Sequence, residues 1–135
     1  MIALPPSKVR NEYWIHTVNS NPPHPWTERS GKWLLFVPFQ KLDQTWKLIA
    51  EETVAGQLGI ESKAATAKPN PIAKNSWIKV VCVYTYDLSD VEDVMRVRKR
   101  LRTIGFEKKL SYKTDQATEQ RIYSTGNNRV SLFFE

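Results

Sequence analysis

The 135-residue sequence is poor in the residues on which metal sites, disulfide frameworks and phosphate loops depend. It contains a single cysteine, Cys82, and two histidines, His16 and His24. One thiol cannot form an internal disulfide, and the three residues do not have the spacing of a metal-binding motif. The five glycines form no Gly-rich phosphate loop, and no nucleophile elbow is present. We therefore expect no metal and no cofactor, and the sequence carries no direct sign of catalysis.

Long hydrophobic runs are also missing. The longest apolar stretches, residues 33–37 and 80–84, are far shorter than the roughly 20 residues that a membrane-spanning helix needs. The first residues lack the charged and apolar segments of a secretory signal. The sequence thus predicts a cytoplasmic protein with no membrane partner.

Hydrophobic and basic residues are well represented. Hydrophobic residues make up 41% of the chain, enough to bury a core, and the length suits one domain at 11–135 after a flexible lead-in at 1–10. Twenty Lys and Arg residues against fourteen Asp and Glu residues give a net charge of +6. This balance favours an anionic partner such as a nucleotide, RNA or a phosphoprotein. No motif that reads DNA sequence occurs, and the oligomeric state is not determined.

Hydrophobic periodicity predicts seven strands and two helices. We expect strands at 11–17, 32–39, 60–67, 77–85, 109–114, 121–124 and 130–134, and helices at 43–57 and 90–104. Asp43 is expected to cap the first helix, Ser89 and Glu92 to form a capping box on the second, and Gly105 to end it. Strands and helices do not alternate regularly, which predicts an α+β domain with one curved, mostly antiparallel sheet of about seven strands. Both helices would cover one face and leave the other open.

Side-chain parity predicts which residues reach the open face. In the strand at 77–85 we expect Lys79 to project there, and the helices to be faced by Ile78, Val80, Cys82 and Tyr84. Outward parities of neighbouring strands hold Lys63, Lys109, Ser111 and Lys113. Lysines that converge on this face would form a cationic bowl for phosphate. The basic run at 96–102 is more typical of a solvated helix face than of a phosphate-tracking stripe.

Five tryptophans are available as core residues or ligand platforms. The amphipathic pattern predicts Trp33, Trp46 and Trp77 in the core, whereas Trp14 fits either role. Trp26 lies in a Pro- and Asn-rich loop, where its ring can stack on a base, with Thr27 or Glu28 at the base edge, or fold back against the sheet. His16 and His24 are weak acid–base candidates because a lone histidine is more often structural. Cys82 is expected to be a small buried hydrophobe.

Several strings of the sequence resemble the basophilic-leukaemia-expressed protein family. They are Tyr13-Trp14-Ile15, Gly31-Lys32-Trp33, residues 63–71 with Lys-Pro-Asn-Pro, residues 81–85, residues 92–98, Tyr112-Lys113 and Ile122-Tyr123-Ser124. The resemblance runs from about residue 13 to 125. Some members of the family carry the label phosphothreonine lyase. The fold of the family is similar to that of the cytoplasmic mRNA cap-binding translation initiation factor.

Two regions also resemble the cap-binding factor itself. Residues 25–28, followed by Gly31-Lys32-Trp33, look like its Trp-Glu loop and the strand after it. The run from Tyr112 to Arg129 is similar to its phosphate-side loops in the order of Asp115, Ala117, Thr118, Ser124, Thr125 and Asn128. The resemblance implies a nucleotide bound on the concave sheet face between an aromatic platform and basic residues.

One departure bears on the ligand. In the factor, two tryptophans sandwich a positively charged methylated guanine, and a glutamate directly follows the second. Here Thr27 separates Trp26 from Glu28, and the second platform is open between Trp14 and Tyr123. A different nucleotide or phosphorylated ligand therefore fits better than the mRNA cap.

These observations lead to one principal hypothesis and two alternatives. The first is a binding module for a nucleotide, cyclic nucleotide or RNA end. Trp26 would stack on the base, Glu28 would contact its edge, and phosphate would be held by Lys63, Thr66, Lys68 and Lys113, with Thr118 and Arg129 from the phosphate-side loops. The second is a phospho-ligand lyase with Lys63 or Lys68 as base and His16 or His24 as acid. The third is an adaptor that binds proteins through its helices.

Overall fold

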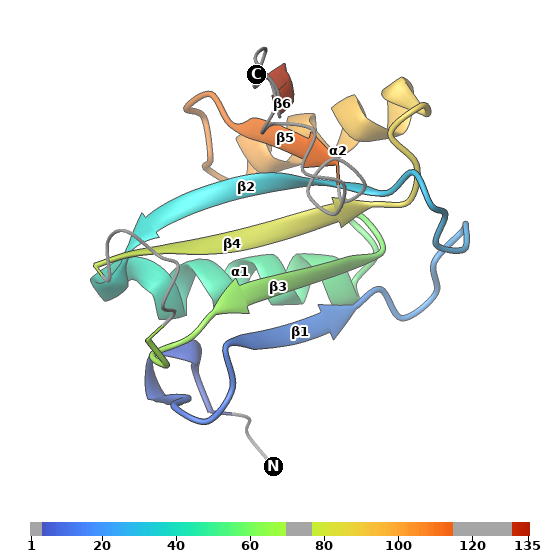
Figure 1. Cartoon of the computed structure of the whole chain (residues 1–135). Helices are drawn as coiled ribbons and strands as arrows, with labels where there is room; N and C mark the ends of the chain where they lie inside the picture. Colours follow the sequence, from blue (N-terminus) through green and yellow to red (C-terminus); the bar gives the residue numbers. More distant parts are fainter. Residues whose placement is uncertain (1–3, 70–76, 115–130) are drawn as a thin grey trace, which may run out of the picture.

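The computed structural model describes residues 4–69, 77–114 and 131–135. Within them the chain forms a six-stranded sheet and two α-helices (Figure 1). The strands are β1 (Trp14–Val18), β2 (Gly31–Pro38), β3 (Glu61–Ala65), β4 (Ile78–Thr85), β5 (Ser111–Thr114) and β6 (Ser131–Phe134). The helices are α1 (Leu42–Val54) and α2 (Val91–Thr103), with short 3-10 turns η1 (Pro6–Lys8) and η2 (Phe39–Lys41). The strand expected at 121–124 lies outside the described residues.

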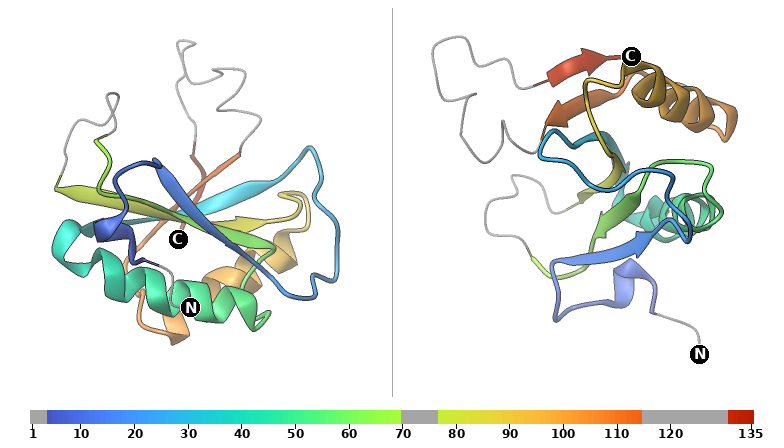
Figure 2. Two further views of the ribbon diagram at one scale, coloured as in Figure 1. Left: turned by 90° about the horizontal axis from the view of Figure 1, so that it is seen from below. Right: turned by 90° about the vertical axis from the view of Figure 1, so that its right-hand side faces the viewer.

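All strand pairs are antiparallel, and the order across the sheet is β1-β3-β4-β2-β5-β6. Both helices cover the same face (Figure 2), because residues of α1 and α2 share one buried cluster with one side of the strands. The predicted α+β class and mostly antiparallel sheet are confirmed. No helix in the described ranges is long and apolar enough to cross a membrane.

The main core lies between the sheet and the helices. Trp33 of β2 is fully buried there, its indole nitrogen donates to the Val94 carbonyl of α2 at 3.1 Å, and its ring packs edge-on against Tyr112 of β5. The predicted core position of Trp33 is confirmed, and Trp46 packs against the same cluster from α1. Trp77 is different, because it precedes β4 at the end of the sheet and its side chain is 66% exposed. The prediction for Trp77 was wrong.

The predicted parity of β4 was wrong by one residue. Val81 and Val83 belong to the core under the helices, whereas Cys82 and Tyr84 pack with Leu34 and Ile60 on the other face. Lys79 shares the parity of the valines, so it does not project from the open face. Both faces of β4 are apolar, and the sequence therefore contains no alternation that would distinguish them.

Both helices have the predicted positions but different N-terminal caps. α1 follows η2 directly, and the carboxylate of Asp43 accepts hydrogen bonds from the backbone N–H and hydroxyl of Ser7 instead of capping the helix. α2 is capped by Asp90, which accepts from the Asp93 N–H at 3.1 Å. The Ser89 hydroxyl donates to Asp87, so the expected capping box does not form. Gly105 follows α2 with a φ of 118°, as its predicted role at the helix end requires.

The first described residues are held against α1, although a loosely held segment was expected. Pro6 and Val9 are buried, and Ser7 contacts Asp43. Further along, a Cβ on Gly59 would lie 1.7 Å from the Tyr84 carbonyl oxygen. Glycine is therefore needed where the turn from α1 into β3 meets the end of β4.

Candidate ligand-binding site

Aromatic rings and lysines gather on the sheet face that the helices leave uncovered. We call this group the open-face cluster; its members are Trp14, Trp26, Lys32, Lys63 and Tyr84. The Lys63 ammonium lies 4.0 Å from the Trp14 ring centroid and 5.7 Å from that of Tyr84, and the Lys32 ammonium lies 5.5 Å from the Tyr84 centroid. The Trp26 ring meets Tyr84 edge-on, with centroids 5.4 Å apart. Five separate segments, namely β1, the loop before β2, β2, β3 and β4, thus contribute to one surface.

Strand register explains why these residues meet. Tyr84 of β4 lies between Glu61 of β3 and Lys32 of β2, and Lys32 is in turn paired with Lys113 of β5. Directly paired residues point to the same face of a sheet. Lys63, Ser111 and Lys113 therefore lie on the open face, as predicted. Lys109 precedes β5, and its ammonium lies 5.7 Å from the ring of Phe134.

Trp26 is positioned by a loop that is fastened to the end of β4. The Thr27 hydroxyl donates to the Tyr86 carbonyl at 2.7 Å and accepts from the Arg29 N–H at 3.0 Å. The Leu88 N–H donates to the Arg29 carbonyl at 2.7 Å, and the His24 ring stacks on Tyr86 with centroids 4.2 Å apart. Trp26 itself stays 47% exposed. The loop therefore holds the indole beside Tyr84 while leaving much of the ring accessible to a ligand.

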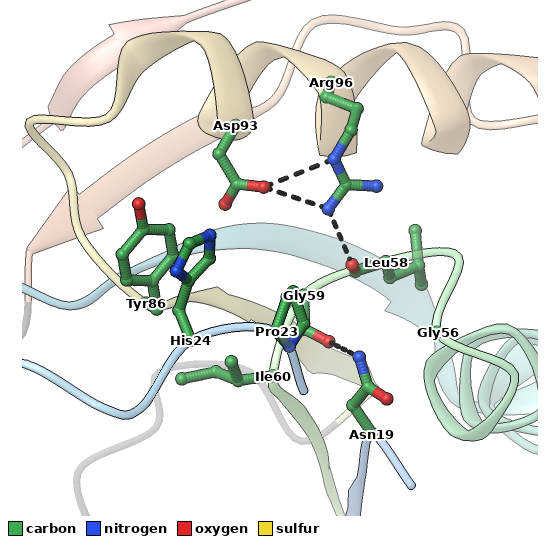
Figure 3. A pocket seen from close by; sticks show the side chains of 10 residues that line it. All are labelled: Asn19, Pro23, His24, Gly56, Leu58, Gly59, Ile60, Tyr86, Asp93 and Arg96. Atoms are coloured by element: carbon green, nitrogen blue, oxygen red, sulfur yellow. Dashed lines mark hydrogen bonds and ion pairs between the residues drawn. The ribbon is translucent and has the colours of Figure 1, made fainter. Parts of the chain in front are cut away.

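A cavity of about 270 Å³ lies at the base of this loop (Figure 3). His24 and Tyr86 line one side, while Arg96 and Asp93 of α2 line another. The polar groups are engaged with each other: Arg96 binds Asp93 and the Leu58 carbonyl, both at 3.0 Å. We call the contacts of Thr27 and His24 with Tyr86, which hold this loop, the loop anchor. We interpret the cavity as part of the loop anchor, because its charged side chains already bind each other and the Leu58 carbonyl.

The loop anchor also shifts the titration of two groups. The Tyr86 hydroxyl donates to the Asp90 carboxylate, which raises the pKa of Tyr86 to about 12. The same hydrogen bond, with the one from the Asp93 N–H, lowers the pKa of Asp90 below its usual value. Near neutral pH the hydroxyl keeps its proton and the carboxylate stays charged, so the contact is intact.

One histidine lies next to the open-face cluster. His16 of β1 pairs in register with Lys63 of β3, and its Nδ1 lies 2.8 Å from Glu61 Oε2. Lysine, histidine and carboxylate are therefore neighbours on the open face. His24, the other acid–base candidate, is stacked on Tyr86 in the loop anchor.

The remaining predicted site residues have varied positions. Thr66 is only 1% exposed, and its hydroxyl donates to the Glu12 carbonyl and accepts from the Lys68 N–H. The Lys68 ammonium lies 4.2 Å from the Tyr13 ring centroid. Glu28 is exposed in the loop that carries Trp26. Thr118, Tyr123 and Arg129 lie outside the described residues.

Sequence reasoning missed Lys32 and Tyr84 as parts of the surface. The parity error on β4 assigned Tyr84 to the core. The position of Lys32 could have been predicted, because Lys32 precedes the fully buried Trp33 and strand alternation therefore puts it on the opposite face. No three His, Cys, Asp or Glu side chains come together in the described part of the chain in a way that could hold a metal ion.

Two arginines of the basic run of α2 make internal contacts, whereas Arg96, Lys99 and Arg102 are exposed. Arg98 is 2% exposed and donates to the carbonyls of Glu135, Phe106 and Lys108 at 2.9, 2.9 and 2.6 Å. Burial lowers the pKa of its guanidinium below the usual value. Arg100 pairs with Glu52 at 2.5 Å. These arginines are thus committed to internal contacts.

The fold and the cluster together define a basic α+β domain with one aromatic and cationic sheet face. A model of the family described as Basophilic leukemia-expressed protein Bles03 matches residues 25–120. This span covers more than half of the chain and includes the Trp26 loop, both α-helices and strands β2 to β5. The chain therefore belongs to the Bles03 family, which confirms the resemblance seen in its sequence.

Proposed function

We propose that this protein binds a nucleotide or a related phosphorylated ligand on the open face of its sheet. The proposal rests on the open-face cluster, in which Trp26 and two lysines surround Tyr84. A base would stack on the exposed Trp26 ring, and Glu28 would contact its edge. Lys63, Lys32 and Lys113 would hold phosphate, while Lys68 would meet a ligand that extends past β3. The resemblance to the cap-binding factor supports the same face.

The Trp26→Ala variant tests this proposal. Stacking of a base on an aromatic ring contributes about 1 to 3 kcal/mol, so we expect the variant to bind about 5- to 150-fold more weakly. The measurement is tryptophan fluorescence during titration with a panel of nucleotides, cyclic nucleotides and capped or triphosphorylated RNA ends, repeated by calorimetry. Trp26 is half-exposed, so the variant should fold normally.

Trp77→Ala is the matched control for that variant. Trp77 is also exposed, but it precedes the other end of β4, roughly 20 Å from Tyr84 at the rise of an extended strand. Wild-type affinity is expected for Trp77→Ala. If no member of the panel bound wild-type protein, or if both variants bound like wild type, the proposal would be rejected.

A lyase is the second candidate, and the pairing of His16 with Lys63 favours it. In such a reaction Lys63 would take a proton from the carbon next to the phosphorylated one, a carbon–carbon double bond would form, and phosphate would leave with a proton from His16. The Lys63 ammonium lies against the ring faces of Trp14 and Tyr84, a contact typical of a charge-binding lysine, which supports charge binding over proton abstraction. Mass spectrometry of a phosphothreonine peptide incubated with the protein would reveal the loss of phosphoric acid that a lyase requires.

A further inference from the structure

Lysine ammonium groups already lie close to two aromatic rings of the open-face cluster, those of Trp14 and Tyr84. The Lys63 ammonium lies over Trp14 at 4.0 Å and within 5.7 Å of the Tyr84 centroid, while the Lys32 ammonium is 5.5 Å from the same Tyr84 ring. An aromatic face attracts cations through its negative quadrupole. Lysines already bind to these ring faces, so a second cation brought to Trp14 or Tyr84 would be repelled by their positive charge.

Positive charge also extends across the sheet. Lys32 on β2 and Lys113 on β5 are direct register partners, and the strands β3, β4, β2 and β5 that carry the lysines and Tyr84 lie side by side (Figure 1). Neighbouring strands are about 4.8 Å apart. Ammonium groups on paired positions repel each other, and an anion that bridges them relieves this repulsion. Several phosphate groups in a chain match such a row better than one phosphate does.

Two acidic residues of the described ranges, Glu61 and Glu28, also belong to this region. Glu61 pairs in register with Tyr84, and its carboxylate is bound by His16 at 2.8 Å. Glu28 is exposed on the loop beyond Trp26. Lysines thus directly face the rings, whereas the carboxylates lie beside a histidine or on the loop.

We infer that the site selects a nucleotide with an uncharged base and two or more linked phosphates, and that it rejects a cationic methylated base. This inference rests on the proposed function and specifies its ligand. Trp26 accepts the base, because its ring meets Tyr84 edge-on and stays 47% exposed. Lys63, Lys32 and Lys113 accept the phosphate chain. The charge on the ligand, more than the identity of the base, decides affinity.

The test compares four ligands by calorimetry: GMP, GDP, GTP and 7-methyl-GTP. Slightly acidic pH keeps the methylated base positively charged. We expect affinity to rise at least about tenfold from GMP to GTP, since each charge-assisted phosphate contact adds to binding. We expect 7-methyl-GTP to bind about tenfold more weakly than GTP, because its cationic base, stacked on Trp26, would lie beside the Tyr84 ring that two lysines already face.

Two variants assign these effects to residues. Lys113→Met should reduce the advantage of GTP over GMP, and Lys63→Met should reduce the discrimination against 7-methyl-GTP. Lys99→Met is the control, because it removes the same charge from an exposed position on α2, on the covered side of the sheet. It should leave both ratios unchanged. Circular dichroism of each variant verifies that it is folded.

The outcomes separate the two proposals. Equal or tighter binding of 7-methyl-GTP, or equal binding of GMP and GTP, would overturn the inference about charge while nucleotide binding itself would stand. The inference about charge would also be overturned if Lys99→Met changed the two affinity ratios as strongly as the open-face variants. Failure of all four ligands and of the wider panel to bind would instead overturn the proposed function, and the inference with it.

Discussion

Arg98 shows how one side chain can hold several segments together. Its guanidinium donates to carbonyls of the turn after α2 and of the residue after β6, and it lies 5.8 Å from the centroid of the buried Trp33 ring. Burial of a charge is unfavourable unless hydrogen bonds compensate it. These carbonyl contacts supply that compensation.

The Arg98→Met variant tests this role. Methionine fills part of the same space but leaves the carbonyls without their donor, so we expect the free energy of unfolding to fall by about 3 kcal/mol. Urea denaturation followed by circular dichroism measures it. Lys99→Met on the exposed side of α2 should change stability by less than about 0.5 kcal/mol. Equal stabilities of the two variants would contradict the structural role of Arg98.

Single residues were predictable from sequence to different degrees. The sequence left Trp26 open between an exposed ring and one folded back against the sheet, and its ring contacts Tyr84 while staying 47% exposed. The burial of Trp33 followed from its apolar neighbours. Trp77 has the same kind of neighbours as Trp33 but precedes β4 at the end of the sheet, and local sequence does not encode where the helical cover ends. The hydrogen-bond partners of Arg98 could not be predicted from its local sequence, because they lie in other segments of the chain.

Among the structural elements, the loop that carries Trp26 depends on the Thr27 hydroxyl, whose hydrogen bonds are internal to the fold. Thr27→Val removes the 2.7 Å hydrogen bond to the Tyr86 carbonyl while keeping the shape of the side chain. We expect about tenfold weaker binding of GTP, because the loop loses the contact that orients the indole. Thr27→Ser keeps the hydroxyl and should bind like wild type. Identical affinities for the Val and Ser variants would show that the loop is held by its other contacts.

The start of α2 gives a prediction about pH. Tyr86→Phe removes the hydroxyl that binds Asp90 but keeps the ring that stacks on His24. The pKa of Asp90 is lowered on folding, so its contribution is present above its usual pKa of 3.8 and is lost as pH falls through the folded value. The pKa of Tyr86 is raised to about 12, so its contribution is present below 10.0 and is lost as pH rises through 12.

Thermal unfolding of both proteins across this range measures the effect. Wild type should unfold at a higher temperature than Tyr86→Phe near neutral pH, and the difference should shrink under strongly acidic conditions. A difference that stayed constant down to the acid limit would show that the hydroxyl acts through something other than the Asp90 carboxylate.

For the whole molecule, sequence periodicity predicted the class but not the arrangement. Two helices on one side of an antiparallel sheet followed from the order of the elements. The β1-β3-β4-β2-β5-β6 order did not, because it depends on pairings between strands that are far apart along the chain. The same holds for the candidate site. The sheet face of Lys63 and Lys113 was predictable from strand alternation, whereas the contact of Trp26 and Lys32 with Tyr84 could be predicted only from the strand order.

The central position of β2 has a consequence for synthesis of the protein. β2 pairs on one side with β4 and on the other with β5, so Trp33 gains its contact with Tyr112 only when residues 111–114 exist. Pairings between distant segments make folding slow, because a long loop must close before any contact compensates for it. A growing chain on the ribosome therefore carries an incomplete sheet, with Trp33 still lacking its Tyr112 contact, until residues 111–114 have been translated. Early binding by a chaperone would protect the incomplete sheet at this stage.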